Sequence, residues 1–538
     1  MAISRSRCIS LILLICLSST FLEFARSDSV YVASHDYSVG AYGGGPYQTF
    51  FSSNYTPVAW NFVQPMNKSK NALTPGYFFT APYGDSTVQP GACIFDNEGQ
   101  LIWDGSAYGA TLVFQVETYL GEPHIVIWSG DILNTGVGSG YINLLNSQYQ
   151  RIARYTTNLT DVVGSVLADF HETRISPRNT ALMTAYYTRE FDLSPVGGPA
   201  AGYILDSVFQ EHNISSGETL FTWHASDHVD PSVCHNPLGD GGGSPTQAWD
   251  YFHINSIDSS SNDGNYLISS RHCFGLYFIN GTSGDIIWQM GGDNSSFTMG
   301  NGTEYSWQHH ARWACMFGVS DEPVSRGVYL GVNFTNMTVE LIQEFPSVND
   351  TISQSQGSVQ LQPNGDILTG WGFMPWYGEF TSAGDLIWKA QFGVIGEANN
   401  EAYRMLRFNW TGEPTAPPDV AIANTVSSSG SNNVISFYVS WNGDTRTSRW
   451  ELIGAPDSSG SKTQSLYNQT RTGFETTITF NTAIKSHEFY AVRALSANGT
   501  HLGTSNFMKP GNGVLAVVVG GWRMVLVVAG ALYALQTL

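Results

Sequence analysis

One phrase recurs three times in this chain of 538 residues: FDNEGQLIW at 95–103, INGTSGDIIW at 279–288 and FTSAGDLIW at 380–388. Each copy has an apolar run, a turn that contains glycine, and a second apolar run that ends in Ile-Trp. This order is typical of a β-hairpin that buries an aromatic side chain. A related hairpin is predicted for LQPNGDILTGWG at 361–372. Hairpins that recur along a chain favour repeated sheets such as propeller blades, although a β-sandwich would produce them too.

Composition indicates a β-rich chain with more than one domain. Aromatic and charged residues each make up 13% of the sequence and glycine occurs 56 times, which suits a turn-rich β protein better than a helical one. The length exceeds that of one ordinary domain. The net charge of −20 argues against nucleic-acid binding, which needs a basic face. An anionic substrate would need a local basic pocket.

A change of pattern marks a second domain. Residues 415–418 (TAPP) form a linker, and several later runs between 434 and 499 alternate apolar and polar residues at short intervals. This alternation is typical of an antiparallel sandwich of the fibronectin type III or immunoglobulin-like kind. The segment contains no cysteine, so it lacks the immunoglobulin disulfide. We expect this sandwich over residues 413–505.

Both ends of the chain predict targeting. Residues 1–27 have a basic start, an apolar core and a small-x-small end at Ala25-Arg26-Ser27, which is typical of a cleaved signal peptide. Residues 506–538 have two interpretations, a C-terminal membrane segment or a GPI-attachment signal with attachment at Asn512. Because no basic stretch follows the apolar run, the GPI signal is favoured. We therefore expect a protein of the secretory pathway that is anchored to the membrane at the cell surface.

Glycosylation sequons and cysteines agree with that compartment. The density of N-x-[ST] sequons is typical of a secreted glycoprotein. The predicted acceptors are Asn54, Asn67, Asn158, Asn213, Asn280, Asn294, Asn301, Asn333, Asn336, Asn349, Asn409, Asn468 and Asn498. Four cysteines remain after the signal peptide, so two disulfides with three possible pairings are expected. These disulfide candidates are Cys93, Cys234, Cys273 and Cys315.

The residues between Trp249 and Trp313 have the side chains best suited to chemistry. Histidines at 253, 272, 309 and 310 and an arginine at 271 lie at the ends of short apolar runs. Neutral imidazole is a nucleophile and base near pH 7, and arginine is a fixed cation suited to a tetrahedral oxyanion. There is no serine nucleophile elbow and no GxxxxGK[ST] phosphate loop. The pattern favours group transfer on an anionic substrate.

Several phrases resemble the arylsulfotransferase family, in its eukaryotic, secreted-type branch. They are WDYFHINSID (249–258), SRH (270–272), GTSGDIIWQMGG (281–292), YSWQHHARW (305–313), PGACIFDNEGQLIWDG (90–105) and ADFHETRIS (168–176). The resemblance extends over roughly residues 70 to 505. It implies an all-β fold, with a six-bladed β-propeller at 28–412 whose active site lies at the central channel. It also implies transfer of a sulfuryl group from an aryl sulfate to a phenol, without a nucleotide donor.

The resemblance also implies the roles of individual residues. His309 matches the family's Gln-His phrase and is expected to be the nucleophile that forms a sulfo-histidine. His253 and Arg271 match a His-x-Asn phrase and an arginine expected to bind the sulfuryl oxygens, and His171 matches a further histidine. Because adjacent strand residues face opposite sides, only one of His309 and its rival His310 should point into the channel.

Further expectations concern the ligands. Aromatic side chains near the channel are expected to stack on small phenolic or aryl sulfate substrates, namely Trp307, Trp249 and Tyr251. We expect no cofactor and no metal, since the cysteine spacings do not fit a zinc site.

Other interpretations remain open. His309 could be a hydrogen-bonded structural histidine, and Arg271 could form a salt bridge between blades. The whole protein could be a non-catalytic propeller that binds glycans or proteins, because one fold serves many functions. In that case His171, His253, Arg271 and His309 need not converge. A quinoprotein-type oxidoreductase is a third possibility, and it requires a Ca²⁺ cage of carboxylate and amide oxygens.

Overall fold

The computed structural model describes residues 30–65, 74–133, 135–160, 162, 164–259, 264–313, 316–319, 324–394, 400–426, 433–481, 487–510, 514–519 and 522–527. The fold is nearly all β. The short helical segments are α2 (His35–Ser38), η1 (Ser106–Tyr108), η2 (Ser194–Val196), η3 (Ala225–Asp227), η4 (Pro231–Val233) and η5 (Pro245–Gln247).

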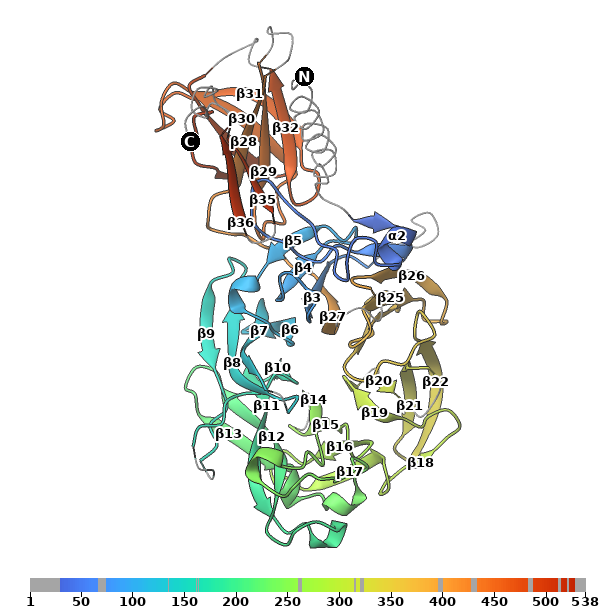
Figure 1. The fold of residues 1–538 in the computed structure, drawn as a ribbon. Coiled ribbons are helices and arrows are strands. Elements are labelled where there is room, and N and C mark those ends of the chain that lie inside the picture. Colours follow the sequence, from blue (N-terminus) through green and yellow to red (C-terminus); the bar gives the residue numbers. More distant parts are fainter. Residues whose placement is uncertain are drawn as a thin grey trace, which may run out of the picture.

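Six sheets form a closed ring around a central axis, which is the architecture of a six-bladed β-propeller (Figure 1). Blade 2 contains β6 (Phe114–Tyr119), β7 (Glu122–Ile132), β8 (Gly138–Leu145) and β9 (Arg151–Tyr155). Blade 3 contains β10 (Thr173–Ile175), β11 (Thr180–Phe191), β12 (Gly202–Asn213) and β13 (Thr219–His224). Blade 4 contains β14 (Ile254–Ser259), β15 (Tyr266–Ser270), β16 (Gly275–Ile279) and β17 (Ile286–Gly291).

The next two blades carry additional outer strands. Blade 5 contains β19 (Ser306–His309), β20 (Met316–Val319), β21 (Arg326–Asn333), β22 (Thr338–Pro346) and the short outer β18 (Thr298–Met299). Blade 6 contains β23 (Ser358–Leu361), β24 (Ile367–Gly370), β25 (Trp376–Phe380) and β26 (Leu386–Gln391). It is extended by β2 (Asn61–Gln64) and β1 (Tyr31–Val32), which come from the start of the described chain.

Blade 1 joins the two ends of the ring. Its outer strands are β3 (Tyr77–Tyr83), β4 (Cys93–Phe95) and β5 (Leu101–Asp104), and its innermost strand is β27 (Glu401–Phe408). β27 pairs antiparallel with β3 over most of its length. Since β27 comes from the far end of the propeller segment, its pairing with β3 closes the ring.

The recurring Ile-Trp phrase occupies the same place in three blades. Its copies are the hairpins β4–β5, β16–β17 and β25–β26, which join the third and fourth strands from the axis. The turn glycines Gly99, Gly284 and Gly384 have φ of 76°, 80° and 92°, a left-handed conformation that glycine adopts readily. The tryptophans that end the phrase are buried. The prediction of repeated hairpins in a propeller is therefore confirmed.

A β-sandwich follows the propeller. One sheet contains β28 (Asp419–Val426), β29 (Asn433–Ser440) and β32 (Thr476–Asn481). The other contains β31 (Gln464–Thr470), β30 (Arg449–Ala455), β33 (Phe489–Leu495) and β34 (His501–Thr504). Their facing side chains form one apolar core that includes Phe437, Trp450, Leu452, Ile478 and Tyr490. Three strands opposite four is the arrangement of a fibronectin type III domain, as the alternation predicted.

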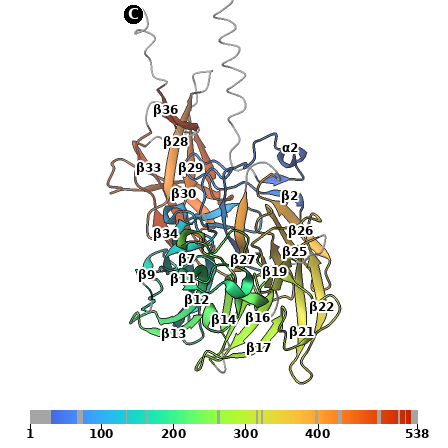
Figure 2. The ribbon, with the colours of Figure 1, turned by 60° about the horizontal axis from the view of Figure 1, so that its bottom comes forward.

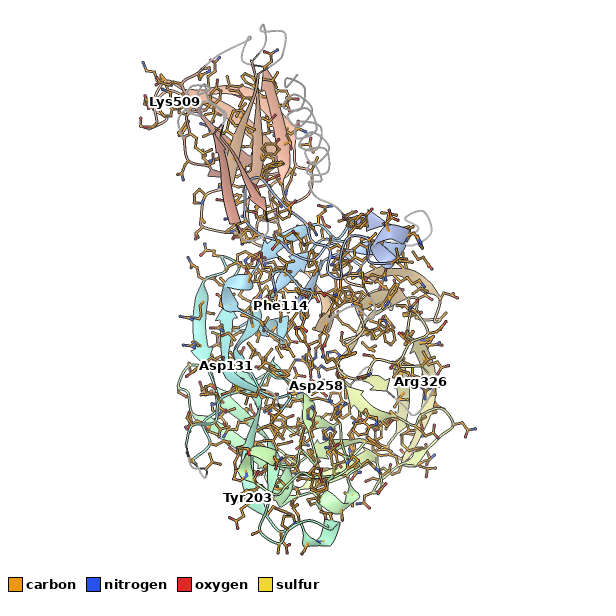
Figure 3. The ribbon with its side chains drawn as sticks, viewed as in Figure 1. Phe114, Asp131, Tyr203, Asp258, Arg326 and Lys509 are labelled. Atoms are coloured by element: carbon orange, nitrogen blue, oxygen red, sulfur yellow. A yellow bond between two sulfur atoms is a disulfide. The ribbon has the colours of Figure 1, made fainter. Side chains whose placement is uncertain are left out.

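The sandwich packs next to blade 1 (Figures 1 and 2). Tyr149 donates a hydrogen bond to the carbonyl of Gly443 at 2.7 Å, and its ring stacks on Trp103. Glu475 accepts a hydrogen bond at 2.6 Å from the backbone N–H of Ser52. Side chains fill the ring as well, with Asp258 near its centre and Tyr203 at its edge (Figure 3). Because the sandwich packs outside the ring, next to blade 1, it lies far from the middle of the ring.

The tail forms a hairpin of β35 (Val514–Val519) and β36 (Trp522–Val527). No helix among the described residues is long and apolar enough to cross a membrane. Several predicted features lie outside the described residues, namely the expected signal peptide at 1–27, the predicted acceptor Asn67, Asn512 and Cys315.

Candidate active site

Polar side chains converge where the inner strands of blades 3 to 6 and blade 1 meet. His171 lies just before β10, His253 directly before β14, and His309 at the end of β19. The ring centroids of His171 and His253 are 4.5 Å apart. Tyr403, in β27, has its ring edge-on to both His171 and His309, at centroid distances of 5.8 and 6.3 Å. The predicted histidines are thus brought together, whereas a scattered arrangement was expected for a non-catalytic propeller.

Two of these histidines are held by carboxylates. His171 donates from Nδ1 to Asp169 at 2.7 Å, and His253 donates from Nδ1 to Asp250 at 2.6 Å. Because the Nδ1 proton is used in this way, Nε2 is the nitrogen available to a ligand. Burial raises the pKa of Asp169, but the neighbouring His171 and N–H donors outweigh that effect, so this pKa is lowered. The pKa of Asp250 is raised by burial.

Arg271 comes from the turn between β15 and β16. Its Nη1 donates to Nε2 of His272 at 2.7 Å, and its guanidinium lies over the ring of Trp307, 4.9 Å from the centroid. The His272 ring is in turn 4.8 Å from that of His253. A disulfide between Cys234 and Cys273 fastens this turn to the long connection that precedes β14. Arg271 therefore lies at the cluster, where its Nη2 also donates to the Gln354 carbonyl at 3.2 Å, and among the described residues it forms no salt bridge between blades.

His309 has a different hydrogen-bond pattern from the other histidines. Its Nδ1 lies 3.0 Å from the carbonyl of Trp307, and its Nε2 accepts from the backbone N–H of Gln356 at 3.3 Å. This pattern fits a neutral ring with the proton on Nδ1 and a lone pair on Nε2. Burial is the main reason that the pKa of His309 is well below its usual value, and Arg271 lowers it further. The nucleophile expected from the resemblance is therefore unprotonated near neutral pH.

Burial lowers the pKa of the other histidines in the same region. The pKa lies well below the ordinary value for His253 and His310, and it is about 3 for His272. Nearby positive groups add to the effect of burial in all three cases. Uncharged imidazoles are therefore favoured at these three positions, as at His309.

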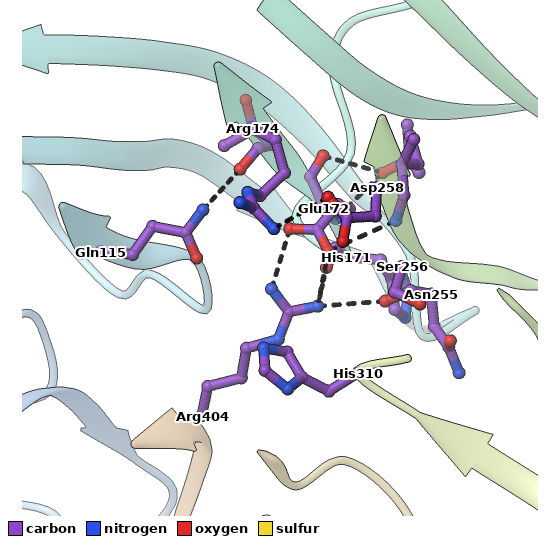
Figure 4. Close-up of polar contacts among 12 residues, drawn as sticks. Gln115, His171, Glu172, Arg174, Asn255, Ser256, Asp258, His310 and Arg404 are labelled. Atoms are coloured by element: carbon purple, nitrogen blue, oxygen red, sulfur yellow. Dashed lines mark hydrogen bonds and ion pairs between the residues drawn. The ribbon is translucent and has the colours of Figure 1, made fainter. Parts of the chain in front are cut away.

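The prediction that only one of His309 and His310 points inward, which assumed regular strand alternation, is wrong. Its Nδ1 lies 3.1 Å from the carbonyl of Val359, in the inner strand of blade 6, and its ring lies beside Arg404 (Figure 4). The reason is a left-handed backbone at His310, with φ of 53°, which ends the alternation of the strand. His310 therefore also faces inward, but toward a separate group of charged residues.

Strained backbone is concentrated here. Positive φ values occur at His253 (60°), Phe274 (51°), Trp307 (54°) and Gln356 (67°), in addition to His310. Such conformations cost of order 1–3 kcal/mol each and are typically found at functional sites. The side chain of Gln308 offsets part of this cost by donating to the Ser270 carbonyl at 2.7 Å.

A buried network of charges lies next to the histidines (Figure 4). Glu172 accepts from Arg404 at 2.9 Å and from Arg312 at 2.7 Å. Arg404 also donates to the carbonyls of His171 and Asn255, at 3.0 and 3.1 Å. The network therefore links blades 1, 3, 4 and 5 and fixes the segments that carry two of the site histidines.

One group of residues has suitable donors for a metal ion. Ligand atoms of Asp250, His253 and His272 lie within 4.8 Å of one another. However, Arg271 donates to His272 and places a fixed positive charge beside the group. The cluster therefore favours an anion over a cation. Within the described residues this group also lacks the cage of oxygen ligands that a quinoprotein Ca²⁺ site requires.

Two predicted substrate-binding residues lie elsewhere. Trp249 and Tyr251 are part of the apolar core of blades 3 and 4, and their polar atoms bond the carbonyls of Asn236 and Val229. They cannot stack on a phenol because their ring surfaces are covered. Trp307, by contrast, is half-buried at the cluster. The partly exposed Trp307 ring and the Arg271 guanidinium above it mark the side from which a substrate can approach.

The cysteine prediction is only partly right. Cys234 and Cys273 form a disulfide, whereas Cys93 is a free thiol in the apolar core of blades 1 and 6. Burial raises the pKa of the Cys93 thiol. No described residue provides Cys93 with a partner.

The predicted glycosylation sites lie at the surface. The exposed acceptors are Asn54, Asn158, Asn294, Asn301, Asn333, Asn336, Asn349, Asn409, Asn468 and Asn498. Asn213 and Asn280 are half-buried.

A hollow lies at the opposite end of β27 from the histidines. It has a volume of about 970 Å³, and its lining includes Tyr77, Glu98, Glu122 and Trp410. β27 begins beside the histidines and ends at Phe408, next to this hollow. We place the chemistry at the histidine cluster, because the hollow contains several carboxylates and no arginine.

Comparison with known proteins identifies the family but no close relative. The solved structures that resemble the chain include a protein of unknown function from Bacteroides caccae (12% identity, TM-score 0.34, covering 62% of this chain and 99% of that one). They also include the β-propeller domain of Cps50 (Swd1) from Myceliophteria thermophila, with 10% identity and a TM-score of 0.32, covering 65% of this chain and 94% of that one. Another is streptogramin B lyase, with 9% identity and a TM-score of 0.28, covering 69% of this chain and 86% of that one. At these TM-scores the likenesses carry no argument about function.

The search of curated proteins finds no match. The model of the family described as Arylsulfotransferase (ASST) matches residues 115–393, which is more than half of the chain and includes blades 2 to 5 with all their site histidines. The chain therefore belongs to the arylsulfotransferase family.

Proposed function

We propose that this protein is a secreted arylsulfotransferase that moves a sulfuryl group from an aryl sulfate to a phenol through a sulfo-histidine at His309. The observation that carries the proposal is the contrast between histidines. His309 has an uncharged ring whose Nε2 lone pair accepts a long hydrogen bond of 3.3 Å from the Gln356 N–H, while Nδ1 of His171 and of His253 is held by a carboxylate at 2.7 and 2.6 Å. Family membership supports the same reaction class.

The reaction takes place in two half-reactions. Nε2 of His309 first gives up its 3.3 Å hydrogen bond from the Gln356 N–H and then attacks the sulfur of the aryl sulfate. The N–S bond forms, the S–O bond to the aryl group breaks, and a phenolate leaves. In the second half-reaction the oxygen of an acceptor phenol attacks sulfur, and the N–S bond breaks. Arg271 stabilises the charge on the sulfuryl oxygens, whereas the uncharged His253, whose N–H is donated to Asp250, holds no proton for them. The Asp169–His171 pair is suited to return a proton to the leaving phenolate and to take one from the acceptor.

A chromogenic aryl sulfate with a phenol acceptor tests the proposal. His309→Ala should abolish both half-reactions, and the wild-type protein should give a sulfo-adduct on a peptide that spans 307–312. Arg271→Ala should raise the barrier by about 2–4 kcal/mol, the usual effect of one lost oxyanion donor. His310→Ala is the matched control, because His310 faces the Glu172 network. Full turnover by His309→Ala would refute the proposal.

We also propose that the protein is held at the cell surface by a GPI anchor. The support is the C-terminal composition, with small residues around Asn512, a spacer and an apolar tail. A phosphatidylinositol-specific phospholipase should release the protein from cells. Recovery of a peptide that contains Trp522 from the membrane-bound protein would favour a membrane-spanning segment instead.

A further inference from the structure

Tyr403 has a buried hydroxyl group without a hydrogen-bond partner. The residue lies near the start of β27 and is 2% exposed. Within the described part of the chain no donor or acceptor pairs with its Oη. Leaving such a group unpaired destabilises the fold, so unpaired groups are rare in native proteins and require an explanation.

The position of Tyr403 suggests that explanation. Its ring is edge-on to His171 and His309 and lies 5.0 Å below the guanidinium of Arg404. Tyr186 also contacts the rings of His171 and His253, but its hydroxyl donates to the Ile254 carbonyl. Tyr186 is therefore satisfied within the protein, whereas the Tyr403 hydroxyl is left for a ligand.

The chemistry of this hydroxyl is that of a donor. Burial raises the pKa of Tyr403, although Arg404 opposes the shift, so the hydroxyl stays protonated near neutral pH. A second donor at the cluster, Nε of Arg271, is also buried and unpaired among the described residues. Two unpaired donors near one uncharged imidazole fit a tetrahedral oxyanion, whose oxygens would accept from both.

We propose that Tyr403 is a catalytic residue that donates a hydrogen bond to a non-bridging oxygen of the sulfuryl group while that group passes to and from His309. This inference rests on the proposed function. The sulfuryl oxygens are common to both half-reactions, whereas the aryl oxygen changes with the substrate. Loss of the hydroxyl therefore slows both half-reactions, and by the same factor for every leaving phenol.

The test compares Tyr403→Phe with Tyr277→Phe. Tyr277 has a fully buried hydroxyl that is also unpaired, but it lies in the core of blades 3 and 4. Each change thus removes a buried, unpaired hydroxyl group and keeps the aromatic ring. A thermal melt of each variant checks that it folds. For a series of aryl sulfates with phenols of different acidity, Tyr403→Phe should lower kcat/KM by about 100- to 1,000-fold, independently of the phenol. Tyr277→Phe should stay within twofold of the wild type.

Two results would overturn the inference. One is a Tyr403→Phe protein within threefold of the wild type. The other is a loss that grows as the leaving phenol becomes less acidic, which would place the hydroxyl at the aryl oxygen.

A binding measurement separates this inference from the proposed function. Calorimetry with an aryl sulfonate, which has the oxyanion but cannot be transferred, should show at least about tenfold weaker binding for Tyr403→Phe. If the wild type binds the sulfonate but shows no transfer, and Tyr403→Phe binds it more weakly, the proposed function fails and the anion contact of Tyr403 stands. If the wild type transfers sulfuryl groups and the two proteins bind the sulfonate equally, the inference fails and the function stands.

Discussion

Replacement of Glu172 by glutamine should destabilise the propeller by a predictable amount. Glu172 is fully buried, and its carboxylate neutralises both Arg404 and Arg312 through contacts of 2.7 to 3.2 Å. Glutamine keeps the shape but leaves two buried guanidinium groups without this counter-charge. Breaking a buried ion pair from one side costs about 3–5 kcal/mol, so the free energy of unfolding should fall by at least that amount. Urea unfolding at pH 7 measures it.

The pH dependence provides a second, independent measure. Burial alone would raise the pKa of Glu172, but Arg312 and Arg404 outweigh it, and the pKa in the folded protein lies below the ordinary 4.5. The unfolded chain therefore takes up this proton first as the pH falls, so the stabilisation is fully present above about pH 4.5 and is lost below it. The difference between wild type and Glu172→Gln should be constant from pH 6 to 8 and shrink toward pH 4.

The exposed Glu190 serves as a control, since Glu190→Gln should change stability by less than about 0.5 kcal/mol. A Glu172→Gln protein within about 1 kcal/mol of the wild type at pH 7 would contradict the assigned role of the network. So would a difference that stays the same at pH 4.

Three other predictions follow from the site. Removal of the Cys234–Cys273 disulfide by a double change to alanine should cost about 4 kcal/mol of stability, because it releases a loop of 39 residues, and urea unfolding of that variant beside reduced wild type checks this. Asp250→Asn should lower kcat more than it raises KM, because His253 loses its orienting carboxylate; an unchanged kcat would rule out that role. Since the pKa of His272 is about 3 in the folded protein, each pH unit below 6.5 should cost about 1.4 kcal/mol for that residue alone. The fall in stability from pH 6.5 to 5 should therefore be less steep in His272→Gln, and parallel curves would contradict the pKa assignment.

Local sequence patterns predicted the fold better than the site. The Ile-Trp hairpins and the alternation after residue 415 each depend on neighbouring residues, and both are found as expected. The carboxylate partners were missed, although Asp169 and Asp250 precede their histidines by only two and three residues. An acidic residue just before a histidine at a strand start could have indicated them.

Other site residues could not be found in this way. Glu172 and Arg404 are 232 residues apart, and only ring closure brings them together. Tyr403 has no motif around it that distinguishes it from a core tyrosine. Conversely, Trp249 and Tyr251 were assigned to the substrate because they are close to His253 in sequence. Their large apolar rings gain more free energy in the core than beside a polar channel.

The site is complete only when β27, from the end of the propeller segment, has paired with β3. Most of its histidines are synthesised well before residue 401, but Tyr403 and Arg404 are supplied by the strand that pairs with β3. A nascent or truncated chain that ends before β27 would therefore have the proposed nucleophile His309 without Tyr403 and Arg404, and blade 1 would lack its inner strand. Catalytic competence would arise in one step, when the last strand docks. Such coupling would keep an incomplete polypeptide from reacting with sulfate esters during its synthesis.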